Sequence, residues 1–264
     1  MTSLFDEEFK VVENKKLADG IYFLKLGAPR SCNTILPGQF VHMRVSDENI
    51  CMLRRPFSVF DTDKDAGTIS IIYAHLGKGT EMMTKWEQGT RSRMIAPLGK
   101  GWGEDTGKLA QANKCLLVGG GLGGAPLYML AKRYCEQGTS VDVVLGAVSA
   151  DQLVLRPFFE KLPLNRLELS TDDGSLGYKG YCTDVAEKLM EENAYDYVAT
   201  CGLKPVMQKV SDCARQYGIR CQVSSEGFMA CGVGACKTCV IDTRFGRLRS
   251  CADGPIFEGS DILW

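Results

Sequence analysis

The sequence predicts a multidomain protein of the α+β class, with an antiparallel β-barrel, a parallel α/β domain and a small C-terminal subdomain. Three observations predict this order. The first hundred or so residues read as short strands between turns, and the next hundred alternate strands with helices. Four of the twelve cysteines crowd into the last part. We expect the three parts to span residues 1–107, 108–222 and 223–264.

The first part contains short apolar runs that are separated by turn-forming residues. Strands are expected near Ile21, Phe40, Ser58, Ile71 and Met94. Gly, Pro, Asp and Asn fill the gaps between them, as in LPGQ and DKDAG. Several short strands with turns at this spacing favour a small antiparallel barrel or sandwich.

The pattern changes at about Lys108, where strands begin to alternate with amphipathic helices. Strands are expected over 114–118, 140–148, 167–170 and 196–200, and helices over 123–138, 151–162, 184–193 and 203–218. This alternation is typical of parallel βαβ units with helices on both faces of one sheet.

Composition excludes several classes of function. The formal net charge of the chain is −1, so electrostatics favour neither nucleic acid nor an anionic membrane surface as a partner. The N-terminal MTSLFDEEFK lacks the pattern of a signal peptide, and no apolar run approaches the roughly 20 residues of a membrane span. We therefore expect a cytoplasmic protein that binds neither nucleic acid nor membranes.

Four clustered cysteines form the most specific motif of the chain. Cys231, Cys236, Cys239 and Cys251 have the spacing C-x4-C-x2-C-x11-C, and the first three match the plant-type ligand spacing of a 2Fe–2S cluster. Glycines in the ACGVGACKTC loop let the backbone curl and direct amides at sulfur. A structural zinc site is the alternative, but zinc ribbons use two C-x2-C knuckles and only one is present.

A glycine-rich loop directly follows the first strand of the α/β part and opens a helix. Gly119, Gly121 and Gly124 satisfy G-x-G-x-x-G, which in this context predicts a site for a dinucleotide pyrophosphate. A tight turn without a ligand is the alternative. The second strand ends in LGAVS without the usual acidic ribose ligand. No Arg or Lys follows that strand immediately, which favours NADH over NADPH.

A third motif, RRPFSVF, lies on an expected strand of the barrel. Arg55, Pro56, Phe57 and Ser58 resemble the R-x-[YF]-S flavin motif of the ferredoxin–NADP reductase superfamily. A guanidinium pairs well with phosphate oxygens, a hydroxyl three residues later can reach the flavin, and the phenyl ring can stack on it. Taken alone, such a tetrapeptide is more often a plain strand with a surface arginine.

Together these motifs resemble those of the electron-transfer subunits of heteromeric, NAD-linked dihydroorotate dehydrogenases. The resemblance covers nearly the whole chain. It rests on PGQFVH, RRPFS, GKGT, PLGKGW, GGGLGGAPL, TDDGSLGYKG, ACGVGACKTC and CADGPIF.

This resemblance implies an oxidoreductase subunit of pyrimidine biosynthesis that transfers electrons between NAD(H), FAD, a 2Fe–2S cluster and a partner. It implies that FAD is held by Arg55, Pro56, Phe57, Ser58, Ile72, Tyr73, Ala74, Gly79 and Thr80. The four clustered cysteines would be the iron ligands. The partner would be an FMN-containing catalytic subunit that oxidises dihydroorotate, in an expected heterotetramer of two plus two.

Two other functions fit the same residues. The module could serve another partner, as in an NADH-dependent ferredoxin:NADP oxidoreductase or a sulfide dehydrogenase. A zinc-stabilised binding module without redox activity is the alternative from another class.

Overall fold

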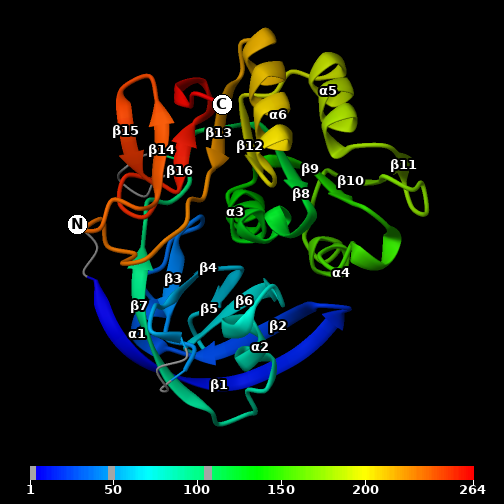
Figure 1. Ribbon diagram of the computed structural model, residues 1–264. Helices are drawn as coiled ribbons and strands as arrows, with labels where there is room; N and C mark the ends of the chain where they lie inside the picture. The colour runs from blue at the N-terminus through cyan, green and yellow to red at the C-terminus, as the bar shows by residue number, and fades with distance from the viewer. Residues whose placement is uncertain (1–3, 47–50, 104–108) are drawn as a thin grey trace.

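The computed structural model describes residues 4–46, 51–103 and 109–264. Two seven-stranded sheets and one separate hairpin form three regions that lie close together (Figure 1). Among the described residues, no helix is long and apolar enough to cross a membrane. The expected order of barrel, α/β domain and cysteine-rich subdomain is confirmed.

The N-terminal sheet is antiparallel and curls into a half-barrel, with the strand order β4-β3-β7-β1-β2-β6-β5. Its strands are β1 (Phe5–Ala18), β2 (Ile21–Gly27), β3 (Phe40–Met43), β4 (Arg55–Ser58), β5 (Asp61–Asp63), β6 (Thr68–Ala74) and β7 (Arg91–Leu98). Two short helices, α1 (Pro29–Cys32) and α2 (Lys78–Thr84), connect them. The long strand β1 was not among the expected strands. Its first half alternates buried and exposed residues, as a half-buried strand does.

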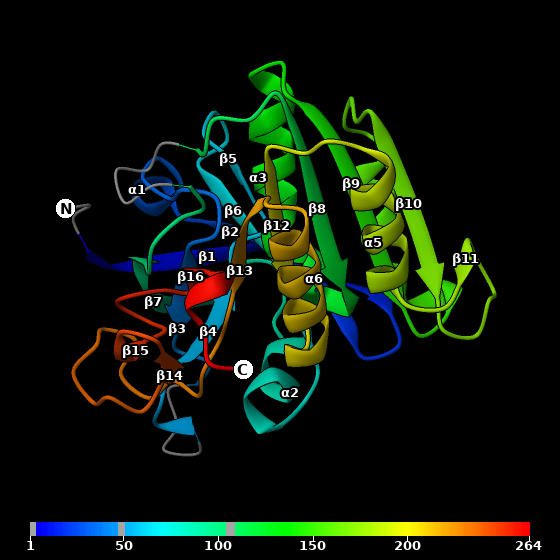
Figure 2. The ribbon, with the colours of Figure 1, turned by 90° about the horizontal axis from the view of Figure 1, so that it is seen from above.

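The second sheet has the order β11-β10-β9-β8-β12-β13-β16. Its strands are β8 (Lys114–Gly120), β9 (Ser140–Ala147), β10 (Arg166–Thr171), β11 (Tyr178–Lys179), β12 (Tyr197–Cys201), β13 (Arg220–Ser224) and β16 (Ile256–Glu258). Its helices are α3 (Ala125–Glu136), α4 (Arg156–Phe159), α5 (Cys182–Glu192) and α6 (Lys204–Gln216). Helices α5 and α6 cover one face, and α3 covers the face toward the barrel (Figure 2).

The helix expected over 151–162 is shorter than predicted. A 3₁₀ turn at Ala150–Gln152 precedes α4, which is only four residues long. Pro157 lies in the first turn of α4, where its missing N–H is tolerated. In the interior of a longer helix it would remove a hydrogen bond, so the helix begins just before Pro157 rather than at residue 151.

The C-terminal part forms the hairpin of β14 (Val240–Thr243) and β15 (Gly246–Arg249), and then returns to the second sheet. There β16 pairs antiparallel with β13, so the last strand extends the second sheet. We propose the division 1–107, 108–222 and 223–264. The first of these boundaries lies outside the described residues, and β16 is where the third part joins the second.

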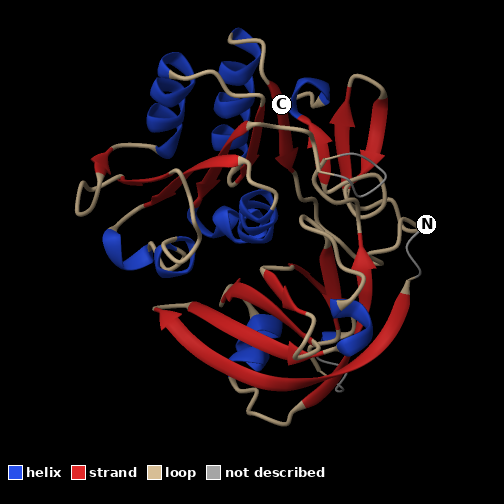
Figure 3. Cartoon of the chain, turned by 180° about the vertical axis from the view of Figure 1, so that it is seen from behind, coloured by secondary structure: helices blue, strands red, loops and turns tan. Residues whose placement is uncertain are grey.

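The barrel packs against α3 through aromatic and polar contacts. The rings of Phe60 and Tyr128 stack with their centroids 4.3 Å apart. Lys132 Nζ lies 3.1 Å from the Asp61 carboxylate, and the Trp102 indole donates to the Pro126 carbonyl at 3.2 Å. These contacts hold the two sheets facing each other, as the view from behind also shows (Figure 3).

Candidate functional site

A large cleft opens at the carboxyl ends of two central strands of the second sheet. The chain proceeds from β8 to β9 on one side and later returns to β12 on the other, which makes the gap between β8 and β12 a topological switch point. Ligands of open α/β sheets bind at such points. The cleft has a volume of about 1670 Å³. This exceeds the roughly 300–1,000 Å³ of a single small-molecule site, so more than one ligand group can fit.

The nine residues expected to hold FAD all line the barrel side of this cleft. They come from three elements, β4, β6 and α2, which lie far apart in the sequence. The residues are Arg55, Pro56, Phe57, Ser58, Ile72, Tyr73, Ala74, Gly79 and Thr80.

Arg55 offers a positive charge to this cleft. Its guanidinium donates to the Leu53 carbonyl at 2.6 Å, and no carboxylate of the described residues forms an ion pair with it. A Cβ built on Gly79 would lie 3.3 Å from Arg55 Nε, so a glycine there leaves room for the guanidinium. A cation without an acidic partner, placed beside a helix start, fits a phosphate group.

Thr80 lies in α2, on the barrel side of the cleft. Its hydroxyl accepts hydrogen bonds from the amides of Leu76 and Gly77, at 2.9 and 3.2 Å. These bonds fix the tight entry into α2. Thr80 therefore orders the backbone of the first helical turn, whose amides have no intrahelical acceptor.

The glycine-rich loop lies across the cleft from the flavin motif. Gly121 lines the cleft, whereas Gly119 and Gly124 pack against each other behind it. A Cβ on Gly119 would lie only 2.5 Å from the Gly124 Cα. A Cβ on Gly123 would lie 2.4 Å from the Cys201 carbonyl oxygen, so this loop touches the end of β12. The glycines therefore let two strand ends meet at the switch point.

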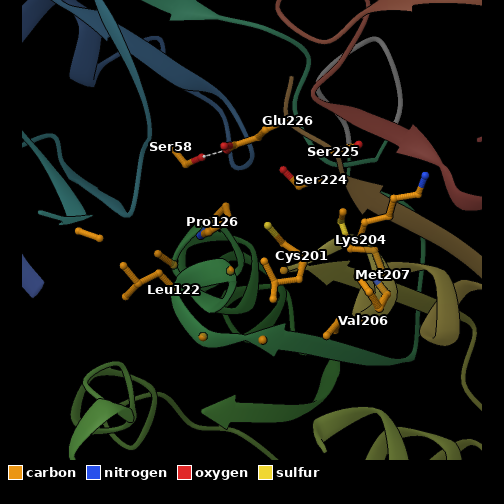
Figure 4. Close-up of a pocket in the computed structure, with 18 of the residues that line it drawn as sticks. Ser58, Leu122, Pro126, Cys201, Lys204, Val206, Met207, Ser224, Ser225 and Glu226 are labelled. Atoms are coloured by element: carbon orange, nitrogen blue, oxygen red, sulfur yellow. Dashed lines mark hydrogen bonds between the residues drawn. The ribbon is translucent and has the colours of Figure 1, made fainter. Parts of the chain in front are cut away.

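Two cleft residues, Glu226 and Cys201, were not identified from the sequence. Ser58 Oγ donates to Glu226 Oε1 at 2.9 Å and so connects the barrel with the segment after β13 (Figure 4). Cys201 lies at the end of β12. Burial, followed by the nearby Glu226 charge, raises the pKa of the Cys201 thiol to about 12, so it stays neutral at neutral pH. The position of Cys201 after a central strand was its only sequence signal.

The structure separates the acidic residues that could contact a ribose. Asp142 is fully buried, and it accepts hydrogen bonds from Tyr195 and Asn165, each at 2.6 Å. It is therefore a structural residue of the sheet. Asp172, directly after β10, lines the cleft instead, and its carboxylate makes no hydrogen bond or ion pair with other residues that the structure describes.

The four clustered cysteines lie together in the loops around the β14–β15 hairpin. The amide of Gly234 donates to Cys251 Sγ at 3.1 Å. The amides of Cys236 and Cys251 donate to Cys231 Sγ and Cys239 Sγ, each at 3.4 Å. Amides directed at sulfur stabilise thiolates and the cluster that they bind.

The loop adopts the left-handed backbone that its glycines were expected to permit. The φ angles of Gly232 and Gly234 are 69° and 84°. Arg249 braces the loop, because it donates to the Gly234 carbonyl at 3.1 Å and forms an ion pair with Asp253 at 2.9 Å. Asp253, the aspartate of the CADGPIF motif, therefore holds Arg249 in position against the cysteine loop.

The thiols differ in burial and in acidity. Cys236 is exposed, and hydrogen bonds from the Thr238 hydroxyl and amide lower the pKa of its thiol to about 6. Cys251 is buried, and burial raises the pKa of its thiol to about 12, so its proton must leave when metal binds. Within the described residues, no three His, Cys, Asp or Glu side chains gather as one metal ion requires. The thiols interact in two pairs, Cys231 with Cys236 and Cys239 with Cys251. Two pairs of thiols fit a two-iron cluster, whose thiolates are divided between two irons.

The fold and the cleft define a class, that of ferredoxin–NADP reductase-like proteins with an added cysteine-rich subdomain. A structure of an NADH-dependent reduced ferredoxin-NADP oxidoreductase superposes with a TM-score of 0.85 at 30% identity, over 97% of this chain and 89% of that one. The ferredoxin reductase of carbazole 1,9a-dioxygenase superposes at 0.65 and 18% identity, over 82% and 67% of the two chains, and so shows the fold alone.

Sequence comparison then identifies the family. The profile of the iron–sulfur cluster binding domain of dihydroorotate dehydrogenase B matches residues 226–263. The electron transfer subunit of dihydroorotate dehydrogenase B (NAD(+)) from Fusobacterium nucleatum is 36% identical, over 97% of this chain and 98% of that protein. The corresponding subunit from Clostridium acetobutylicum is 38% identical, over 96% of each. The chain belongs to the family of dihydroorotate dehydrogenase B electron transfer subunits.

Proposed function

We propose that this chain passes electrons between NAD(H), FAD, a 2Fe–2S cluster and the FMN of a catalytic partner subunit that acts on dihydroorotate in pyrimidine biosynthesis. One observation carries the proposal. A single cleft joins the flavin motif of the barrel to the glycine-rich loop at the switch point, and the cysteine loops pack on the same barrel.

Each group has its own set of residues. FAD is held by Arg55–Ser58, by Ile72–Ala74, and by Gly79 and Thr80. The loop of Gly119, Gly121 and Gly124 receives the nicotinamide dinucleotide, and Cys231, Cys236, Cys239 and Cys251 hold the cluster. When bound, the flavin accepts two electrons as hydride and releases them singly to an iron–sulfur centre.

The side chains of the cleft bind and orient the ligands rather than react with them. Arg55 neutralises phosphate, while Ser58 and Glu226 place a polar pair between the barrel and the segment after β13. Leu122 and Pro126 add apolar surface to the same cleft (Figure 4). The neutral Cys201 thiol adds a small side chain without charge at the end of β12.

The partner would supply the dihydroorotate site. Within the described residues, the barrel and the α/β sheet are both used for the cleft, and no further barrel is present to hold FMN. The exposed Cys236 places one end of the cysteine loop at the surface. We therefore infer a complex with an FMN-containing catalytic subunit, as a heterotetramer of two plus two.

Reconstitution with the partner tests this function. The purified chain should oxidise NADH with an artificial one-electron acceptor but should not oxidise dihydroorotate. Adding an FMN-containing dihydroorotate dehydrogenase subunit from a relative's operon should produce NAD-linked dihydroorotate oxidation. Dihydroorotate oxidation by the chain alone, or no gain with any such subunit, would contradict the proposal.

The same module in another complex is the second candidate. The superposition on the NADH-dependent ferredoxin-NADP oxidoreductase structure favours it. Coupling of the chain to a ferredoxin:NADP subunit, without coupling to a dihydroorotate subunit, would identify this second function.

Asp172 provides a test of nicotinamide specificity. A carboxylate at the end of a strand can accept from the ribose 2′-hydroxyl of NADH and repels the 2′-phosphate of NADPH. The Asp172→Asn variant should therefore lose about tenfold in kcat/KM for NADH, which corresponds to roughly 1.4 kcal/mol. For NADPH, kcat/KM should fall less or should rise. Asp151→Asn, an exposed neighbour that does not line the cleft, is the matched control. An unchanged NADH/NADPH ratio in Asp172→Asn would remove Asp172 from the ribose site.

A further inference from the structure

His42 is a buried histidine whose ring nitrogens form no well-aligned hydrogen bond within the described part of the chain. Its side chain is fully buried, and neither Nδ1 nor Nε2 makes a hydrogen bond of normal geometry with the described residues, although the backbones of Arg54 and Cys231 lie close enough to interact with the ring. Buried polar groups are almost always paired, because an unpaired one loses its bonds to water without replacement. A fully buried imidazole whose nitrogens lack a well-aligned hydrogen bond therefore indicates a group that it contacts when the protein carries its cofactors.

The neighbours of His42 identify the place of that group. A Cβ built on Gly232 would lie only 2.4 Å from His42 Nδ1, so the ring touches the residue that follows the first clustered cysteine. On the barrel side, His42 pairs with Pro56 of the flavin motif in the β3–β4 ladder. The ring therefore lies beside Pro56 on the face of the sheet that meets the Cys231–Gly232 turn.

The alternation along β3 supports this placement. Phe40 belongs to a small cluster with Leu98, Cys239 and Cys251, whereas Val41 and Met43 belong to the core of the barrel. Successive side chains of a strand point to opposite faces, so His42 shares the face of Phe40. The cysteine loops thus pack on the face of β3 that carries Phe40 and His42, and His42 contributes a polar side chain to this face.

We propose that His42 is a positioning residue that donates a ring N–H to the cluster at its Cys231 end and fixes the cluster loop against the flavin strand. The inference rests on the iron–sulfur cluster of the proposed function. Hydrogen bonds to cluster sulfurs stabilise the more negative, reduced form and so raise the reduction potential. His42 would thereby favour electron transfer from the flavin to the cluster.

Isotope labelling tests the contact without changing the ring. The chain contains only two histidines, His42 and the exposed His75. In the full chain reconstituted with FAD and cluster and labelled with 15N-histidine, pulsed EPR of the reduced cluster should show a 15N coupling. That coupling should persist in His75→Gln and disappear in His42→Phe. A normal cluster spectrum without any 15N coupling would overturn the role of His42, whereas absence of a cluster spectrum would overturn the proposed function.

A redox titration supplies the second readout. In His42→Phe, the equilibrium between the flavin and the cluster should shift about tenfold toward reduced flavin, which is about 59 mV for a one-electron couple. His42→Gln keeps an N–H donor, so its cluster potential should stay close to that of the unmodified protein. Phe40→Leu, on the same face of β3, should also change the potential little. An unchanged cluster potential in a His42→Phe variant that retains its iron would contradict the proposal. If His42→Phe loses its cluster, the proposal is tested by the 15N coupling in the labelled His75→Gln protein, whose absence would contradict it.

Discussion

Replacing Cys236 with serine should eliminate the iron–sulfur cluster and leave the flavin in place. The cysteine loops pack on barrel residues Phe40 and Leu98, while the residues that we propose hold FAD line a cleft to which none of the four cysteines contributes. Cys236 is exposed, so its loss removes a ligand without emptying the core. Iron content and cluster absorption should fall to background, and NADH oxidation with a two-electron dye should remain.

The control for this variant is Cys135→Ser, which changes a half-buried thiol of α3 outside the cluster. It should keep both iron and FAD. Because serine oxygen can sometimes replace a thiolate, Cys236→Ala should be measured in parallel. Intact cluster spectra in Cys236→Ala would show that Cys236 is not an iron ligand.

Replacing Arg55 with alanine should release FAD. The Arg55 guanidinium lines the cleft without a carboxylate partner among the described residues, and each charged hydrogen bond that it would give to phosphate contributes about 1.5–3 kcal/mol. The loss of one such bond weakens FAD binding by about 10- to 150-fold, and the loss of a bidentate pair by more. FAD per chain after gel filtration and the Kd from flavin fluorescence measure the effect.

Arg91→Ala is the matched control for Arg55→Ala. Arg91 also lies on a barrel strand, but it pairs with Glu8 at the surface, where ion pairs contribute about 0–1 kcal/mol. This variant should retain FAD with unchanged stoichiometry. Equal FAD content in Arg55→Ala and Arg91→Ala would make Arg55 an ordinary surface residue of its strand.

The features predicted from the sequence are those that local spacing determines. The cysteine motif, the glycine-rich loop and the R-x-F-S strand each span only a few residues, and their chemistry follows from residue type and order. Alternating strands and helices likewise predicted the sheet of β8, β9, β10 and β12. The parallel α/β domain could therefore be recognised before any contact was known.

The features that were missed depend on contacts between distant residues. Ser58 and Glu226 are 168 positions apart and meet only because the segment after β13 lies against the barrel. The β16–β13 pairing and the contact of His42 with Gly232 also form across the domains. The periodicity of a single segment does not indicate which distant residues it will contact, so these contacts could be identified only from the structure.

An anaerobic titration of the purified chain with NADH tests the central claim most directly. Visible absorption and EPR spectra would be recorded together as NADH is added in small steps. We expect bleaching of the flavin band, followed by the paramagnetic signal of a reduced 2Fe–2S cluster, at about one cluster per chain. A colourless, zinc-containing protein, or a coloured protein whose spectrum NADH leaves unchanged, would contradict it.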